Sequence, residues 1–197
     1  GEEVEREAAA QLSAAAAVGR AVNDRIGPTR MALAELNGTL SAAQAGLHDM
    51  ADIGGERWGQ PMLDSARALL AEALGRLERL EQPEQKFTPE GAQQAMAQIE
   101  SLVKDTREKA ATVHEDIARR VAEVRERRAQ LTQALADGEA AAAANPALQD
   151  EWRLVRQQIA GLELRWKNAT SYAEGLDAMT QAVQRAQRFV EAIAHRS

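Results

Sequence analysis

The fold is decided by residues 96–134, which read MAQIESLVKDTREKAATVHEDIARRVAEVRERRAQLTQA. Apolar side chains recur in this stretch at alternating steps of three and four, and residues 148–194 carry the same pattern. A repeat held over so many turns is typical of a coiled-coil seam, whereas an ordinary globular helix carries a broader and shorter apolar stripe. The two stretches therefore predict one long helical hairpin over residues 88–195, folded between residues 138 and 146.

Two helix-start signals frame this hairpin. Thr88 is followed by Pro89, and Asn145 is followed by Pro146. In each pair a capping side chain precedes a proline, and proline is tolerated at the first helical position because its missing N–H would have no partner there. The first arm is expected to end near Gly138, and the alanine-rich residues that follow could be either fraying helix or loop.

The N-terminal part, residues 1–81, is predicted to be a kinked first helix followed by a short one. Proline disfavours helix at the residue before it, so Gly27-Pro28 predicts a kink or a short break, and one helix or two both fit the pattern. Residues 52–60 contain three glycines and are predicted to be a loop. Pro61 is then expected to open the short helix at its first position.

Composition supports an all-α fold, an elongated antiparallel helical bundle built on the long coiled-coil hairpin. Hydrophobic residues make up 45% of the 197 residues, but aromatic residues only 3%. Alanine supplies much of the apolar content, and thin seams between helices accept alanine better than a thick globular core does. We expect residues 1–197 to form a single elongated domain.

Several functional classes are disfavoured by residue content. The net charge is −6 with acids and bases interspersed, which argues against a nucleic-acid partner, because such proteins need a basic face. The absence of cysteine excludes disulfides, thiolate metal sites and cysteine nucleophiles. The three histidines are scattered without ligand spacing. We therefore expect no metal site, no cofactor and no enzymatic activity.

Two arginines interrupt the seam. Arg120 and Arg127 lie one heptad apart, and in the predicted hairpin they face the neighbourhoods of Glu163 and Gln157. Their stems could pack at the edge of the seam with the charged heads in water or paired to Glu163. Alternatively they form an anion site between helices, because guanidinium forks match carboxylates. The neighbouring charges, such as Arg125 and Arg128, are expected to form a solvated helix face.

Tryptophan gives the remaining candidates. Trp152 and Trp166 lie two heptads apart on one face, where they either fill gaps in an alanine-rich seam or line a pocket. Trp152 is taken with Arg120 and Arg127 as the predicted ligand-binding set. Trp58 lies in the predicted glycine-rich loop and could plug the end of the bundle or present a contact.

A soluble bundle whose first and last helices lack terminating signals resembles, in architecture, the extracytoplasmic sensing domains of bacterial chemoreceptors and histidine kinases. The resemblance implies a non-enzymatic sensory module outside the cytoplasm, and the seam arginines predict that its ligand is a small anion. The long, overhanging seam predicts a homodimer, since a partner would cover its exposed apolar side chains. The resemblance also implies a tether to a membrane by segments outside this sequence, since the sequence has no apolar run long enough to span one.

A second interpretation stays open. A long seam that overhangs its neighbours is also typical of a coiled-coil scaffold or adaptor, such as a secretion-system component, that acts through protein–protein contacts. The sequence does not exclude a cytoplasmic location for either function.

Overall fold

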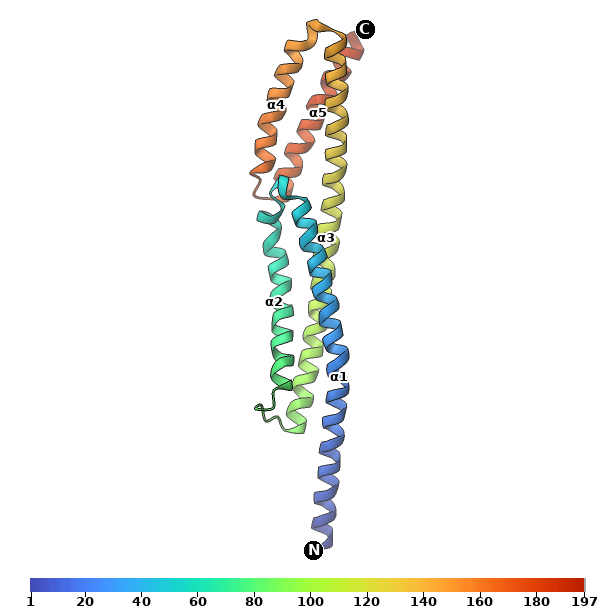
Figure 1. Ribbon diagram of the computed structural model, residues 1–197, viewed down its shortest axis with the longest axis vertical. Coiled ribbons are helices and arrows are strands. Elements are labelled where there is room, and N and C mark those ends of the chain that lie inside the picture. Colours follow the sequence, from blue (N-terminus) through green and yellow to red (C-terminus); the bar gives the residue numbers. More distant parts are fainter. Residues whose placement is uncertain (197) are drawn as a thin grey trace. The chain divides into compact units, whose positions relative to one another are not determined.

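The computed structural model describes residues 1–196, and its regular structure over that range is entirely helical. Figure 1 shows the order of the elements. There are five α-helices and two short 3₁₀ turns: α1 (Glu2–Asp49), η1 (Ala51–Ile53), α2 (Gly55–Glu81), α3 (Pro89–Ala144), η2 (Pro146–Leu148), α4 (Gln149–Lys167) and α5 (Tyr172–Arg196). The prediction of an all-α fold is confirmed.

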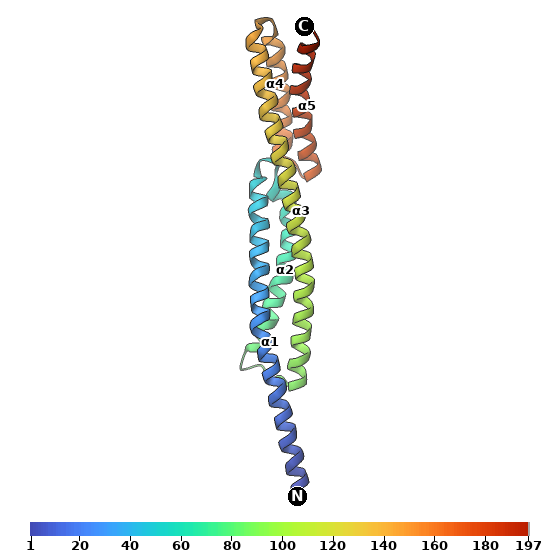
Figure 2. The ribbon, with the colours of Figure 1, turned by 90° about the vertical axis from the view of Figure 1, so that its right-hand side faces the viewer.

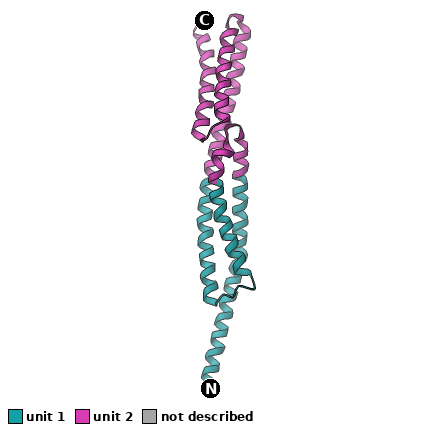
Figure 3. Ribbon diagram, turned by 90° about the vertical axis from the view of Figure 1, so that its left-hand side faces the viewer, with its two compact units in different colours: residues 1–42, 63–114 teal, residues 43–62, 115–197 magenta. Residues whose placement is uncertain are grey.

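The chain divides into two compact units, coloured separately in Figure 3. Unit 1 comprises residues 1–42 and 63–114, and unit 2 comprises residues 43–62 and 115–197. The helices α1, α2 and α3 each contribute residues to both units. That the chain forms a single domain stays a prediction.

Unit 1 is built from α1, α2 and the first half of α3, which lie side by side in Figures 1 and 2. Ion pairs join Arg25 to Glu100 and Arg30 to Glu81 at its surface. The core contains side chains from all three helices that are at most 2% exposed: Leu33, Leu40, Leu63, Ala66, Leu77, Met96 and Ile99.

The helix α1 continues through Pro28, so the predicted break there is absent and the segment is one helix. A proline inside a helix costs about 3 kcal/mol, because one backbone hydrogen bond is lost. Val22 precedes the proline and Leu33 follows it, and both are buried in unit 1. Burial of the apolar face on both sides of Pro28 offsets the cost and keeps the helix continuous.

Unit 2 corrects the predicted hairpin. Its second arm is two helices, α4 and α5, that pack against each other beside the second half of α3 (Figures 1 and 2). Trp152 of α4 meets Phe189 of α5, and Gln158 of α4 meets Arg185 of α5, so the two helices run antiparallel. The prediction of one unbroken helix over residues 148–194 is therefore wrong.

The break between α4 and α5 has a local cause. The Asn168 amide donates to the carbonyl of Leu164 at 2.9 Å and competes with continued helix. Ser171 Oγ accepts from the Glu174 N–H at 3.2 Å, and the Glu174 carboxylate accepts from the Thr170 N–H at 3.2 Å. Ser171 is thus an N-cap, and its spacing from Glu174 is that of a capping box.

The predicted loop over residues 52–60 is also wrong. The turn is confined to η1 and Gly54, whose φ of 75° lies in the left-handed region that favours glycine. The helix α2 begins at Gly55, so Pro61 lies inside it and not at its first position. A Cβ atom on Gly59 would lie 2.4 Å from Leu47 Cδ2. This glycine therefore serves close packing of α1 against α2.

The predicted helix start at Thr88 is confirmed, whereas the one at Asn145 opens a 3₁₀ turn and α4 begins at Gln149. Thr88 Oγ1 accepts from the Gly91 N–H at 3.0 Å, and α3 begins at Pro89. Asn145 Oδ1 accepts from the Ala147 N–H at 3.2 Å and caps η2. The alanine-rich residues beyond Gly138 are helical, because α3 extends to Ala144.

Burial in unit 2 gives a first test. Ile159 is 6% exposed and Leu164, on the same helix, is 63% exposed. We expect Ile159→Asp to lower the free energy of unfolding by more than about 3 kcal/mol, because it places a polar group in the core without a partner. Leu164→Asp should change it by less than about 0.5 kcal/mol. Urea denaturation followed by circular dichroism measures both, and equal effects would show that the buried face of α4 is wrongly assigned.

Candidate functional site

Arg120 lies over two aromatic rings. Its guanidinium carbon lies 4.6 Å from the ring centroid of Tyr172 and 5.3 Å from that of Trp58. The buried Nε faces Asp116 Oδ2 at 3.1 Å, an ion pair without hydrogen-bond alignment. The predicted neighbour Glu163 instead pairs with Lys167 at 2.8 Å. The pairing prediction fails because the break before α5 brings Tyr172 to this level of α3.

The rings around Arg120 are themselves fixed. The Trp58 indole donates to the carbonyl of Ile53 at 3.0 Å, and its ring centroid lies 5.4 Å from that of Tyr172. The Tyr172 hydroxyl donates to the Glu123 carboxylate. Burial first, and then this hydrogen bond and the charge of Glu123, raises the pKa of Tyr172 well above its usual range. Trp58 is thus packed within unit 2.

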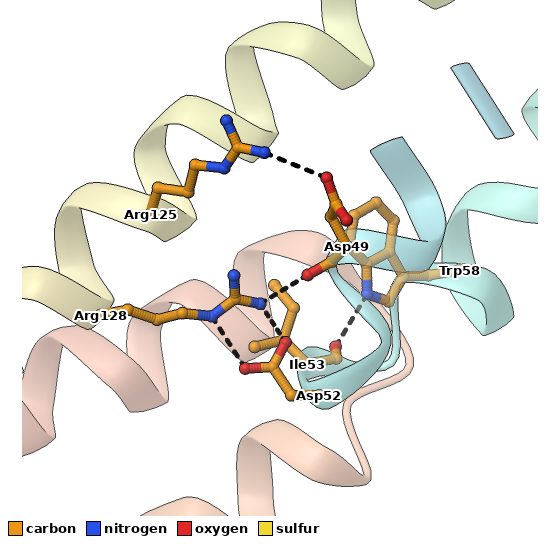
Figure 4. A network of polar contacts seen from close by, with 6 residues as sticks. All are labelled: Asp49, Asp52, Ile53, Trp58, Arg125 and Arg128. Atoms are coloured by element: carbon orange, nitrogen blue, oxygen red, sulfur yellow. Dashed lines mark hydrogen bonds and ion pairs between the residues drawn. The ribbon is translucent and has the colours of Figure 1, made fainter. Parts of the chain in front are cut away.

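A second group of arginines holds the η1 turn against α3 (Figure 4). Arg125 lies 3.1 Å from Asp49 Oδ2, while Arg128 donates to Asp52 Oδ2 at 2.9 Å and to the carbonyl of Asp49 at 2.8 Å. Arg57 donates to the carbonyl of Ala169 at 3.0 Å. Arg125 is 66% exposed, as expected for a solvated face, whereas Arg128 is half-buried against the turn, so the expectation is wrong for Arg128. Their acidic partners lie 76 residues away, and sequence spacing alone does not reveal them.

Arg127 lies in different surroundings from Arg120. Its Nε donates to Thr180 Oγ1 at 3.1 Å and one terminal nitrogen donates to Gln130 Oε1 at 3.3 Å. It makes no ion pair within residues 1–196. The predicted neighbour Gln157 is not its partner, because α5 and not α4 supplies the contact. The structure does not bring Arg120 and Arg127 to one shared site.

Trp152 is 4% exposed, and its indole donates to Glu139 Oε2 at 2.7 Å. The centroid of its ring lies 4.9 Å from the ring centroid of Phe189 on α5. A Cβ atom on Gly138 would lie 2.2 Å from the Trp152 ring, so the absence of a side chain there lets the indole sit against the backbone of α3. Trp152 therefore fills the core, and one edge of it also reaches a groove.

This groove, the Trp152 groove, lies between the last turns of α3 and the first turns of α4 and encloses about 500 Å³. Its apolar part is made of small side chains and the indole, and its polar part carries two arginines, one acid and two amides. Its lining residues are Glu139, Ala142, Ala143, Gln149, Trp152, Arg153, Arg156, Gln157 and Ala160. Of the three predicted ligand-binding residues, only Trp152 lines it.

A second groove of about 460 Å³, the α4–α5 groove, lies between those two helices. It has three arginines and no acid among its lining residues: Gln158, Gly161, Leu162, Arg165, Gln181, Gln184, Arg185 and Arg188. Sequence analysis missed it, because an unbroken second arm would place Arg165 and Arg188 far apart. The capping signal at Ser171 and Glu174 is the feature that could have revealed the fold-back.

Comparisons of the chain with protein-family models, with curated proteins and with solved structures find no match. Within residues 1–196, no group of three or more histidine or acidic side chains is placed to hold a metal ion. No helix in this described part has the length and apolarity needed to cross a membrane.

The environment of Tyr172 predicts a delayed ionisation. It is the only tyrosine in the chain, so tyrosinate absorbance reports on it alone. In urea it should ionise near pH 10, whereas the folded protein should resist ionisation well beyond that pH. Because the pKa of Tyr172 is higher in the folded state than in the unfolded state, its neutral phenol contributes to stability below the unfolded-state pKa. This contribution is lost as pH rises above about 10. Coincident titration curves in the folded and unfolded states would contradict the buried Tyr172–Glu123 contact.

The contact of Gly138 with Trp152 predicts opposite effects of one substitution at two sites. Gly138→Ala should lower the free energy of unfolding by about 1–2 kcal/mol, because overpacking against the indole exceeds the gain in helix propensity. Gly161→Ala should raise it by about 0.5–1 kcal/mol, since a Cβ there meets nothing within 4 Å. Urea denaturation measures both, and a stabilised Gly138→Ala variant would exclude the packing described for Trp152.

Proposed function

We propose that this chain is a non-enzymatic, ligand-binding helical module with a sensory role, and that its ligand is a small organic anion with an apolar body. The observation that carries the proposal is the Trp152 groove, where an alanine and tryptophan surface lies beside two arginines. Binding sites for small molecules commonly combine an apolar surface with a few polar groups that fix orientation.

The arginines of this groove are free enough to exchange partners. Arg156 lies 3.8 Å from Glu139, beyond hydrogen-bond distance, and Arg153 pairs with Asp150 at 3.2 Å. Their side chains are 63% and 70% exposed. Ion pairs this exposed contribute little stability, so replacing them by a ligand carboxylate costs little. A guanidinium can hold such a carboxylate through two parallel hydrogen bonds.

A sensory role follows from what Trp152 touches. Its indole is bonded to Glu139 of α3 and packs against Phe189 of α5, so a ligand against its exposed edge adds contacts where three helices meet. Small shifts between packed helices are a common means of switching. The groove residues include no paired nucleophile and base, which supports binding without chemistry.

The proposal includes the wider properties that the resemblance to sensing domains implies. These are an elongated antiparallel bundle, a homodimer, a position outside the cytoplasm and a membrane tether supplied by segments outside this sequence. No nucleic-acid partner is included, because acids and bases are interspersed along a chain of net charge −6.

One observation favours the coiled-coil scaffold as a second candidate function. Residues 2–21 of α1 have no buried side chain, and Val4 and Leu12 are 67% and 72% exposed. A helix of about five turns with exposed apolar residues is a surface that a partner helix could cover.

The test uses hexanoate as a probe, with hexan-1-ol as its uncharged match, in thermal-shift and calorimetric titrations. Hexanoate should stabilise the protein, and Arg156→Gln should weaken its binding about two- to fivefold, the effect of one exposed ion pair. Arg6→Gln, on an exposed turn of α1, is the matched control and should bind like the wild type. Equal responses to acid and alcohol, or unchanged binding by Arg156→Gln, would contradict the proposal and favour the scaffold.

A further inference from the structure

The α4–α5 groove is not used by the proposed function, and its chemistry differs from that of the Trp152 groove. We propose that it is a second binding site, for an extended dianion: a hydrocarbon chain with a carboxylate at each end. Three features of the groove support this ligand: its charge, the spacing of its arginines and its neutral middle.

The charge of this groove is uncompensated. Arg165 and Arg188 make no hydrogen bond or ion pair with any residue that the structure describes, and Arg185 donates only to the neutral amide of Gln158, at 2.7 Å. The nearby Asp177 accepts a hydrogen bond from Gln181 at 2.7 Å, so an amide and not an arginine occupies it. By contrast, both arginines of the Trp152 groove lie within 4 Å of an acid. The α4–α5 groove is thus the part of unit 2 where positive charge gathers without a partner.

The arginines stand at the two ends of the groove. Gln158 lies level with Arg185, because the two side chains are hydrogen-bonded across the helix pair. Arg165 follows Gln158 by two turns of α4, about 10 Å along the axis. Arg188 lies one turn of α5 beyond Arg185, on the side away from Arg165. A ligand in the groove therefore meets one arginine at one end and two at the other.

The middle of the groove is neutral and open. A Cβ atom on Gly161 would meet nothing within 4 Å, and Leu162 supplies a half-buried apolar wall. A hydrocarbon linker fits this wall. An inorganic polyphosphate carries charge along its whole length. Its binding would remove the central charges from water against Leu162, which costs free energy. The character of the middle thus selects a dicarboxylate with separated ends.

Recognition depends on both ends together. A single exposed arginine–carboxylate pair is weak, because both groups remain well hydrated. Once one end of the ligand is held, the other end is at high effective concentration beside its own arginine. A dicarboxylate long enough to span the groove should therefore bind far more tightly than a ligand with one carboxylate. Succinate is too short to reach both ends and should not bind more tightly in this way.

The experiment compares azelate with its monomethyl ester, which has the same length but one carboxylate, by calorimetric titration of the full chain. Azelate should bind at least tenfold more tightly than the ester. Arg165→Gln should reduce azelate binding to the level of the ester, and Arg188→Gln, which leaves Arg185 at that end, should reduce it part of the way. Both residues are exposed and neither side chain makes a hydrogen bond or ion pair with the described residues, so both variants should keep the wild-type melting curve.

The controls separate this site from the Trp152 groove. Arg153→Gln removes an exposed arginine from the same helix but from the other groove, and Arg156→Gln removes the residue on which the proposed function depends. Both variants should keep the wild-type affinity for azelate at the tighter site, although Arg156→Gln weakens any additional binding of azelate or its ester in the Trp152 groove. The inference would be overturned if azelate does not bind, or if it binds no more tightly than the ester. It would also be overturned if Arg165→Gln and Arg188→Gln leave azelate binding unchanged, or if Arg153→Gln causes a loss of equal size. Tighter binding of tripolyphosphate than of azelate would exclude the hydrocarbon-linked ligand.

Discussion

The contact of Arg120 with the adjoining rings of Trp58 and Tyr172 is the one on which unit 2 depends. It joins the start of α2, the middle of α3 and the start of α5, three segments that lie far apart in the sequence. A guanidinium taken out of water loses hydration, and two aromatic faces together with the carboxylate of Asp116 replace part of what is lost. An arginine suits this position because its flat, weakly hydrated head can lie over aromatic rings.

The turn at η1 is positioned by the same part of α3. Arg125 and Arg128 bind the acids of this turn from one side, and Arg57 reaches the carbonyl of Ala169 in the connection between α4 and α5. A Cβ atom on Gly175 would lie 3.3 Å from the carbonyl of Ile53, so α5 also approaches the turn closely. Each surface ion pair alone contributes little, but here several fix one short turn, which the buried side chain of Ile53 also anchors.

The sequence predicted helices whose capping residues and apolar repeat lie close together in the chain. It did not predict features that depend on contacts between residues far apart in the chain. The caps at Thr88 and Asn145 and the long apolar repeat of α3 are local, and the structure has them as predicted. The break after α4 was missed because the 3,4 repeat continues across it, although Ser171 and Glu174 carry the capping pattern. The glycines near residue 55 suggested a loop, whereas their lack of side chains serves close helix packing. The partners of Arg120 could not be predicted, because they depend on a fold-back that places Tyr172 beside α3.

The position of α4 between the two grooves has a consequence for both proposed sites. This helix has 19 residues and is anchored by three buried side chains, Trp152, Ile159 and Trp166, spaced at seven residues. The Trp152 groove lies on its α3 side and the α4–α5 groove on its α5 side. A ligand that bridges α4 to α5 favours positions of α4 close to α5, and a ligand held against α3 favours the opposite. Coupling between sites is reciprocal, so if α4 moves as a rigid body, each ligand weakens the binding of the other by the same factor. A helix that stays fixed on its three anchors would instead let both grooves fill independently.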